Sequence, residues 1–305
     1  MKTFLLKKLM QIIPVLFIIS FIVFLLVYVA GDPVLLMLPD DATPEDIEAL
    51  RSALGLDKPF ITQYCIYLTN MLKGDFGRSF RYNQPALPIV LERLPASLQL
   101  TFSAIIFSIV VSIPLGIWSA TKQNTFLDVF ISGISVLGRA MPHFWVGIML
   151  VLILSVNFKI LPVSGRGTAA HLILPTFTLG ISVASELTRL VRSNMLEILQ
   201  QDYIRTAKSK GLSDFIIIFK HAFKNALIPV VTFISIQIPM IIGGALITET
   251  VFSWPGLGQL IVQAVYGRDM AIIQACVFVI AILAIAISLV TDFIYSMIDK
   301  RIQYS

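Results

Sequence analysis

Between Lys224 and Glu249 the chain reads NALIPVVTFISIQIPMIIGGALIT, a run over residues 225–248 without a single Asp, Glu, Lys or Arg. A helix needs about 20 consecutive apolar residues to cross the hydrocarbon core of a bilayer. Hydrocarbon offers no hydrogen-bond partners to an open backbone, so a segment that crosses it must be helical. This stretch therefore predicts a membrane-spanning helix.

The composition of the whole chain agrees with a membrane location. Of its 305 residues, 57% are hydrophobic and 13% are charged, and the mean hydropathy is +0.87. Soluble domains carry about 25% charged residues, and a chain of this length cannot hide so much apolar surface inside a water-soluble fold. The net charge is +5, and the positive residues lie between the apolar stretches. No basic patch is interleaved with aromatic residues, so we expect no nucleic-acid partner.

Windows without charged residues predict six transmembrane helices in an all-α membrane protein that forms one domain over residues 1–305. We place the spans at about residues 9–31, 96–121, 140–158, 167–190, 227–248 and 270–295. The first apolar run is too long for a signal peptide, so we expect a retained helix. The apolar stretch from Val129 to Gly138 is short, and it is either an interfacial segment or an extension of the third span.

The distribution of Lys and Arg predicts the orientation. With a cytoplasmic N-terminus, the short loops that carry Lys122, Arg139 and the basic residues from Arg189 to Lys224 all face the cytoplasm, as the positive-inside rule requires. The long loop over residues 32–93 then lies outside. Both termini are expected in the cytoplasm.

The external loop contains two predicted helices. The run Thr43-Pro44-Glu45-Asp46 is typical of a helix start, with a threonine N-cap, proline at the first helical position and acids near the positive end of the dipole. An amphipathic stretch follows from Phe60 to Lys73, and Gly55 and Gly74 can end the two helices. These helices either cap the bundle or contact a partner.

The cytoplasmic loop over residues 193–226 has a more specific pattern. A helix is expected from Asp202 to Lys210, Gly211 stops it, Ser213 can cap a second helix, and Pro229 opens the fifth span. The result is either a rigid knob that transmits motion from a soluble partner or a solvated basic loop that only fixes topology.

At this loop the sequence resembles the permease subunits of binding-protein-dependent ABC importers, in particular the dipeptide, oligopeptide and nickel group. The small residues Thr206 and Ala207, then Gly211 and later Ile228-Pro229 match the loop pattern. Arg205 stands where the general pattern has glutamate, and the gap from Gly211 to Pro229 is longer; both departures are typical of the peptide group. Further matching motifs are Gly31-Asp32-Pro33, residues 54–59 (LGLDKP), residues 74–77 (GDFG), residues 161–165 (LPVSG) and residues 249–258 (ETVFSWPGLG).

The resemblance implies a type I ABC importer permease-like fold with a helical external loop and a cytoplasmic coupling helix, in the bacterial cytoplasmic (inner) membrane. It also implies a second, homologous permease subunit, two ATPase subunits that bind ATP and Mg²⁺, and an extracytoplasmic solute-binding protein. The long loop after the first span is typical of the first of the two permease types. The coupling residues that dock on the ATPase would be Asp202, Tyr203, Arg205, Thr206, Ala207, Lys208 and Gly211.

The chain shows no catalytic chemistry of its own. The sequence contains no Gly-x-x-x-x-Gly-Lys-Ser/Thr phosphate loop, so energy is expected to come from a partner. His143, His171 and His221 are scattered without metal-ligand spacing. We expect neither an enzyme nor a cofactor or metal site in this chain.

Polar residues near the spans are candidates for the translocation path. Thr232, Ser235 and Gln237 of the fifth span either line the path or serve helix packing, and Gly243 with Gly244 could allow close helix approach. Other candidates concern charged residues and the outer end of the fifth span. Glu186 is expected to pair with Arg189 one turn later rather than with solute. Asp292 is expected to anchor at the interface or to meet an arginine of the coupling loop. Trp254 and Pro255 form either an interfacial turn or an outer gate or binding-protein contact.

The solute has alternatives. A peptide importer is the first hypothesis, a permease for nickel or a nickel chelate is the second, and a self-contained channel or secondary transporter is the third. The last would need inverted repeats or a buried ion relay, and neither is evident in the sequence.

Overall fold

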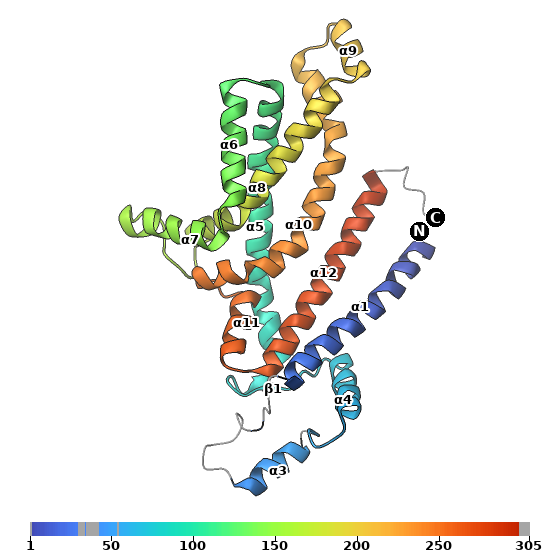
Figure 1. Ribbon diagram of the computed structural model, residues 1–305, viewed down its shortest axis with the longest axis vertical. Coiled ribbons are helices and arrows are strands. Elements are labelled where there is room, and N and C mark those ends of the chain that lie inside the picture. Colours follow the sequence, from blue (N-terminus) through green and yellow to red (C-terminus); the bar gives the residue numbers. More distant parts are fainter. Residues whose placement is uncertain (1, 30–33, 35–42, 54, 299–305) are drawn as a thin grey trace. The chain divides into compact units, whose positions relative to one another are not determined.

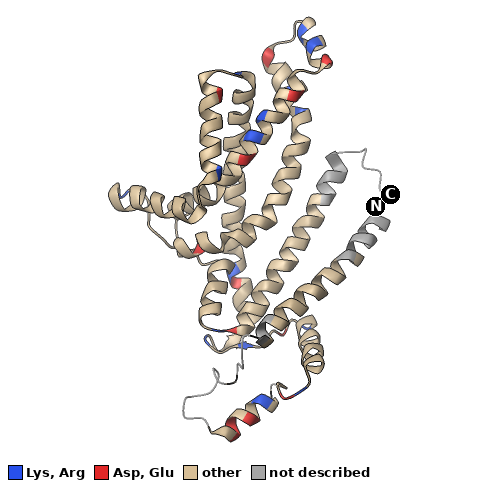
Figure 2. Cartoon of the chain, in the orientation of Figure 1, with Lys and Arg blue, Asp and Glu red and all other residues tan. Residues whose placement is uncertain are grey.

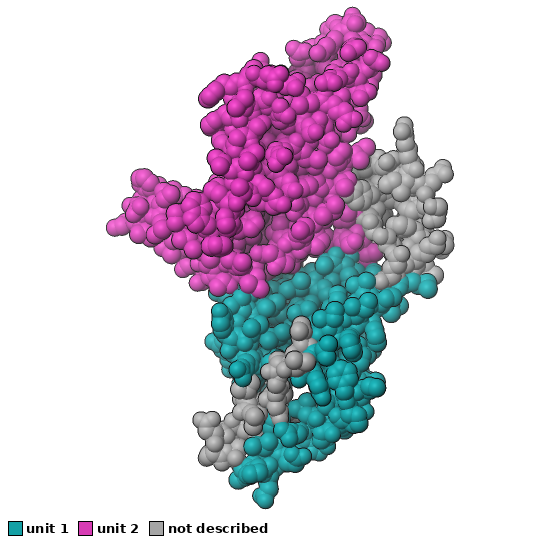
Figure 3. Space-filling model, in the orientation of Figure 1, with its two compact units in different colours: residues 1–95, 256–285 teal, residues 96–255, 286–305 magenta. Residues whose placement is uncertain are grey.

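The computed structural model describes residues 2–29, 34, 43–53 and 55–298, and it divides into two compact units. Unit 1 comprises Met1–Pro95 and Gly256–Ile285, and unit 2 comprises Ala96–Pro255 and Ala286–Ser305 (Figure 3). The motif at residues 31–33 lies outside the described residues, as do Leu54 and the side chain of Asp292.

Unit 1 joins the N-terminal helices to two segments near the C-terminus (Figure 1). Its elements are α1 (Lys2–Val29), α3 (Pro44–Ala53), α4 (Phe60–Leu72), β1 (Arg78–Ser79), β2 (Gln84–Pro85), the start of α5 (Ala86–Thr121), α11 (Leu257–Tyr266) and most of α12 (Met270–Ile298).

The predicted start of α3 is confirmed. The side-chain and backbone groups of Thr43 donate to the Asp46 carboxylate at 2.7 and 3.0 Å, and the Asp46 N–H donates back to the Thr43 hydroxyl at 3.2 Å. This reciprocal box satisfies N–H groups that a helix start otherwise leaves open.

The predicted helix α4 is also confirmed, and its aromatic face packs on α1. Tyr64 contacts Phe17, Phe21 and Phe24 with ring centroids 5.3–5.8 Å apart, and its hydroxyl lies 3.0 Å from the Ser20 hydroxyl. Edge-on aromatic contacts of this kind add to the free energy that burial provides. Within unit 1, α4 therefore lies along the first predicted span.

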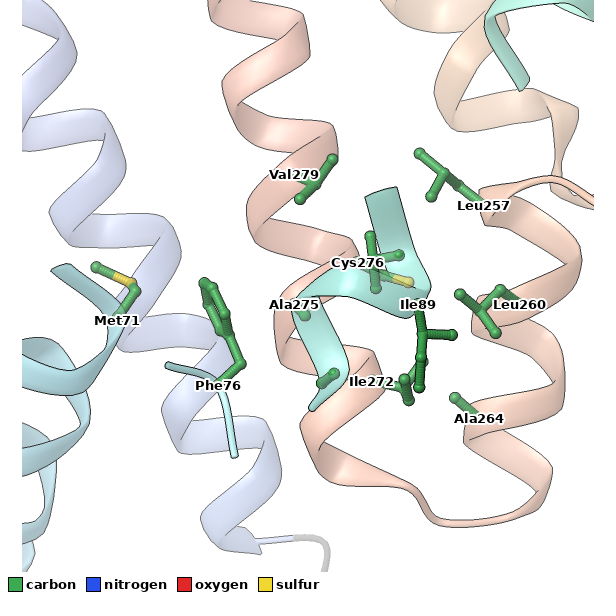
Figure 4. Close-up of a cluster of buried hydrophobic side chains, with 12 residues drawn as sticks. Met71, Phe76, Ile89, Leu257, Leu260, Ala264, Ile272, Ala275, Cys276 and Val279 are labelled. Atoms are coloured by element: carbon green, nitrogen blue, oxygen red, sulfur yellow. The ribbon is translucent and has the colours of Figure 1, made fainter. Parts of the chain in front are cut away.

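The core of unit 1 brings the segment after α4 against α11 and α12. Phe76 and Ile89 pack with Leu260, Ile272 and Cys276 in one buried cluster (Figure 4). A short hairpin precedes α5, with Arg78 paired to Pro85 and Ser79 to Gln84; the sequence analysis did not predict it.

Unit 2 is a bundle around one long helix. Its elements are the rest of α5, α6 (Phe126–Ala140), α7 (His143–Leu150), the π-helical η1 (Val151–Asn157), α8 (Ala169–Leu199), α9 (Asp202–Ser209), the π-helical η2 (Ile216–Phe223), α10 (Lys224–Val251) and the end of α12. Helices α6, α7 and α10 all contact α8, which buries more residues than any of these three.

Small residues allow the close approach of α8. A Cβ atom added at Gly116 would lie 2.6 Å from Cβ of Val191, and one at Gly180 would lie 2.5 Å from a ring carbon of Phe107. Membrane helices pack through such small residues because lipid offers no hydrophobic drive for their association. The prediction for Gly243 and Gly244 is wrong for the described chain, because no atom there lies within 4 Å of a Cβ built at either glycine.

Four helical segments of the described chain are long and apolar enough to cross a membrane. They are Ala86–Thr121, Ala169–Leu199, Ile216–Val251 and Met270–Thr291. They lie on the second, fourth, fifth and sixth predicted spans. The first three extend beyond the predicted bounds because the helix continues through charged residues such as Arg93, Arg192 and Lys224. Pro229 lies inside α10 rather than opening it. The first predicted span falls on α1, whose described apolar part is Ile12–Leu25.

The third predicted span, residues 140–158, falls on α7 and η1, which together run from His143 to Asn157. The chain bends by 104° between Phe126–Ala140 and His143–Asn157, so this pair is a broken span or a re-entrant segment. A proline disfavours helical backbone at the residue before it, and the break falls at Met141, directly before Pro142. The stretch from Val129 to Gly138 belongs to the separate helix α6, so Lys122 and Arg139 lie at opposite ends of that helix rather than in one short loop.

Candidate functional site

A short exposed helix, α9, lies at one end of unit 2, between α8 and η2 (Figure 1). Its inner face is apolar: Ile204 and Ala207 are buried in a cluster that includes Met195 of α8 and Ala226 of α10. The exposed residues of α9 include Asp202, Tyr203, Arg205, Thr206 and Lys208. Of the predicted coupling residues in α9, only Ala207 faces inward, and the others form one accessible surface, which we call the α9 surface.

Gly211 ends α9 as the sequence predicted. Its φ of +73° lies in the left-handed region, and its N–H donates to the carbonyl of Lys208 at 2.9 Å. The N–H of Leu212 donates to the carbonyl of Ala207 at 3.4 Å. These two hydrogen bonds form the usual glycine termination of a helix and fix the turn tightly.

The α9 surface is tied to α10 as well as to α8. The Asn225 side-chain amide donates to the Tyr203 hydroxyl at 2.9 Å, and η2 continues into α10 so that Ile216–Val251 forms one helical segment. A displacement of α9 would therefore be carried into the long helices through packed contacts.

The charges of the α9 surface are available to a partner. Charged residues gather at this end of unit 2, whereas few occur along the apolar helices (Figure 2). Asp202 and Arg205 lie 3.7 Å apart, with their side chains 97% and 76% exposed. Exposed pairs of this type contribute little to stability, so a docking partner could recruit either charge at small cost.

Exposed aromatic rings lie beside these charges. The rings of Phe215 and Phe219 lie with centroids 4.7 Å apart and their planes tilted by 40°, and both side chains are exposed. Phe215 directly precedes η2 and Phe219 lies within it, and η2 contacts α9. Aromatic residues and arginine are enriched at protein–protein interfaces.

A second polar feature lies inside the bundle of unit 2. A cavity of about 150 Å³ is lined by Arg139 at the end of α6, His143 at the start of α7, Glu186 near the middle of α8 and Gln237 near the middle of α10. The sharp bend between α6 and α7 places the first two side chains beside the other two. We call these four residues the polar cluster.

The prediction that Glu186 pairs with Arg189 is wrong in this structure. Glu186 Oε2 lies 3.6 Å from the Arg139 guanidinium and accepts from the Gln237 amide at 3.4 Å. The helical-spacing rule considers only neighbours on the same helix. A charged partner on another helix is decided by tertiary packing, which the sequence does not reveal.

The three path candidates of the fifth span separate in the structure. Gln237 lines the cavity, Ser235 is buried, and the Thr232 hydroxyl donates to the carbonyl of Ile228 at 2.9 Å. Of these three path candidates, only Gln237 contacts other polar side chains. The role of all three as path residues stays a prediction.

Trp254 is buried rather than presented at the surface. Its indole N–H donates to the carbonyl of Ala96 at 2.8 Å, and the Arg166 guanidinium lies over its ring at 5.6 Å. Arg166 itself donates to Gln99 at 2.8 and 3.0 Å. In this conformation the Trp254 side chain cannot touch a docking protein directly, and Pro255 is half-buried beside it. A gating role for the pair stays a prediction.

The sequence also did not predict the ion pair between Asp128 and Arg192 of unit 2. Asp128 at the start of α6 is buried, and Arg192 of α8 donates to its two oxygens at 2.7 and 2.8 Å. The Ser119 hydroxyl and the Asn124 N–H also donate to this carboxylate. The one available signal was a lone acid beside an apolar stretch. This pair, which we call the Asp128 clasp, fixes the turn between α5 and α6 onto α8.

The fold and the α9 surface define a class of protein. A bundle of apolar helices, with an exposed helix between two of the long ones, is the architecture of a type I ABC importer permease. The chain belongs to the family of binding-protein-dependent transport system inner membrane components. The family pattern matches residues 112–304, and the pattern for the N-terminal part of such components matches residues 1–101.

Relatives match over the full length of both chains. The chain is 38% identical over 316 aligned residues to the oligopeptide transport system permease protein AppB of Bacillus subtilis. It is 36% identical over 333 residues to the dipeptide transport system permease protein DppB of Alkalihalophilus pseudofirmus, and 37% identical over 305 residues to the glutathione transport system permease protein GsiC of Escherichia coli.

A solved structure supports the fold. The inward-facing methionine ABC transporter MetNI contains a chain that superposes with a TM-score of 0.60 at 21% identity, over 69% of this chain and 96% of that one. At this identity the likeness concerns the fold alone.

Proposed function

We propose that this chain forms half of the path by which a binding-protein-dependent ABC importer moves di- and oligopeptides across the bacterial cytoplasmic membrane. Its full-length relatives are named for oligopeptides, dipeptides and glutathione, which is itself a peptide. The other half of the path would be a second, homologous permease subunit. An extracytoplasmic solute-binding protein would deliver the peptide.

The observation that carries this proposal is the α9 surface. The sequence contains no phosphate-binding loop, so the energy of ATP has to reach the spans through contact with other subunits. Two partner ATPases, which would bind ATP and Mg²⁺, would dock one on each permease. The α9 surface is exposed, rigidly terminated and packed on α8 and α10, which suits it to receive such a force.

The proposal sets the orientation. The α9 surface faces the cytoplasm, where ATP is available, and its basic residues agree with the positive-inside rule. Both termini are then cytoplasmic, and the loop with α3 and α4 faces the delivering protein.

The alternatives are weaker. The relatives described above are named for peptides, so the nickel hypothesis is not favoured. Membership of a binding-protein-dependent family disfavours a self-contained channel or secondary transporter.

Site-directed cross-linking in the assembled transporter tests the proposal. Lys208→Cys on the α9 surface is expected to cross-link to an ATPase subunit, whereas Lys73→Cys, exposed at the end of α4, is expected to react only with reagents added from outside. Labelling of Lys208→Cys from the outside would contradict the proposal. Uptake of nickel but not of labelled dipeptide by cells that express the system would contradict the choice of solute.

A further inference from the structure

The polar cluster differs from an ion pair that only holds helices together. In the Asp128 clasp the carboxylate is 4% exposed and Arg192 is bound through two short hydrogen bonds. In the polar cluster the side chains of Arg139 and Glu186 are 57% and 38% exposed, and they lie 3.6 Å apart. Short, bidentate hydrogen bonds between charged groups are the strong ones, so the polar cluster is held much more loosely than the Asp128 clasp.

Hydrogen-bonding capacity in the cluster is left over. Both contacts of Glu186 go to Oε2, and Oε1 takes no hydrogen bond from the described residues. Arg139 makes one further long contact, 3.5 Å to the Ser182 hydroxyl, although a guanidinium has five N–H donors. The charges therefore face the cavity with capacity for another molecule.

The position of the cluster makes a solute role physically reasonable. Glu186 and Gln237 lie near the middle of two helices long enough to span the membrane. Ionisable groups at such depth are costly in hydrocarbon, and they mark substrate pathways in membrane proteins. A cavity of about 150 Å³ is several times the volume of about 30 Å³ that a water molecule takes in the liquid, so it admits a small polar group.

We propose that Arg139, Glu186 and Gln237 form a site in the path for the charged ends of a short zwitterionic peptide. This inference rests on the proposed function. Glu186 accepts hydrogen bonds from the terminal ammonium group, and Arg139 donates to the terminal carboxylate. Gln237, with both a donor and an acceptor, bonds to the peptide amide between them.

The chemistry favours a zwitterion over a single ion. The cluster holds one positive and one negative side chain, so a lone cation or anion would take one and leave the other without a counter-ion at membrane depth. A zwitterion replaces each internal partner with an external one and leaves no charge uncompensated. The apolar part of the lining, with Val183, Met240 and Ile241, suits aliphatic side chains, and methionine adapts readily to different shapes.

The test measures initial uptake of radiolabelled dialanine by the complete transporter in proteoliposomes, with saturating binding protein and ATP. Glu186→Gln and Arg139→Gln are each expected to lower uptake about tenfold, because each removes a charge-assisted hydrogen bond to the solute. ATP hydrolysis without solute is expected to stay within about twofold of the wild type, since the exposed pair adds little to stability. Glu92→Gln, which removes the same charge from an exposed position on α5, is the matched control and is expected to leave uptake unchanged.

The double variant Arg139→Gln/Glu186→Gln separates a solute site from a structural pair. If the two charges bind opposite ends of the solute, uptake falls further in the double variant than in either single variant, although the two losses add only in part because the residues are in contact. If the double variant transports as well as the single ones, the charges serve only each other and the inference is overturned. Should a charge variant fail to assemble, Gln237→Leu takes its place. Its expected loss is about threefold, from one neutral hydrogen bond, and unchanged uptake would overturn the site.

Failure of the site and failure of the proposed function give different results. Wild-type transporter that accumulates no dialanine, or any other short peptide, contradicts the function. Wild-type transporter that accumulates dialanine while both single variants match it contradicts the site alone.

Discussion

At the scale of single residues, the Asp128 clasp is where one substitution should cost the most stability. Asp128→Asn removes the charge that Arg192 grips with two hydrogen bonds and leaves a guanidinium without its counter-ion. Breaking a buried pair by removing one partner costs about 3 kcal/mol or more. We expect the unfolding midpoint of the detergent-purified chain to fall accordingly in thermal or denaturant titrations.

The exposed pair of Asp202 and Arg205 supplies the control for this measurement. Asp202→Asn removes the same charge from a side chain that is 97% exposed, so the midpoint should move by no more than a small fraction of the Asp128→Asn shift. Equal shifts for both variants would show that the clasp is not a structural element.

Asp46 offers a pH-dependent prediction in the external loop. Hydrogen bonds from the Thr43 side chain and then from its backbone lower the pKa of the Asp46 carboxyl below its ordinary value of 3.8. Because the folded pKa is depressed, the cap's contribution to stability is present above the unfolded pKa and is lost as pH falls through the folded pKa. Carboxyl ¹³C NMR titration of aspartate-labelled chain should show this pKa rise in Thr43→Ala. The same pKa in wild type and variant would contradict the cap.

At the scale of elements, we expect the turn after α9 to control how force from the proposed ATPases reaches the bundle. Gly211→Pro is incompatible with a φ of +73° and removes the N–H that bonds to Lys208. We expect ATP-driven uptake to fall at least about tenfold while the partner ATPases still hydrolyse ATP, since even about 1.4 kcal/mol of misplacement energy corresponds to that factor.

Asparagine at the same position is the matched control. Gly211→Asn tolerates left-handed backbone, and no described atom lies within 4 Å of its Cβ position, so most of the uptake should remain. Full uptake by the proline variant would show that α9 does not transmit the force.

The packing of α5 on α8 gives a second prediction at this scale. Gly180→Ala would place a methyl group 2.5 Å from Phe107 and 3.0 Å from the carbonyl of Ala104, so the helices must separate. Overpacking of this kind costs about 1–3 kcal/mol. Gly243→Ala, in open space on α10, should be neutral or stabilising in the same denaturation assay. A lower midpoint for Gly243→Ala than for Gly180→Ala would contradict this packing.

At the scale of the whole molecule, the sequence was a good guide to what local chemistry decides. Charge-free windows predicted the long apolar helices. The box from Thr43 to Asp46 predicted the start of α3, and Gly211 predicted the end of α9. Each of these signals acts within one turn or one hydrophobic window, so it can be recognised without tertiary structure.

The features that the sequence did not reveal depend on contacts between elements. Glu186 pairs with Arg139 of another helix rather than with Arg189 of the same helix, and Arg192 of α8 pairs with Asp128 of α6. The bend before Pro142 had a visible signal, but a long apolar run concealed it. The polar cluster needs α6, α7, α8 and α10 in place, which explains why only Gln237 was predicted for it.

The proposed function depends most on partner ATPases that drive this chain through the α9 surface. The direct measurement is accumulation of labelled dialanine in proteoliposomes that contain both permease subunits and the binding protein, with and without the ATPase subunits. We predict accumulation above the external concentration only when ATPases and ATP are both present. Uphill accumulation by the permeases alone would contradict this prediction.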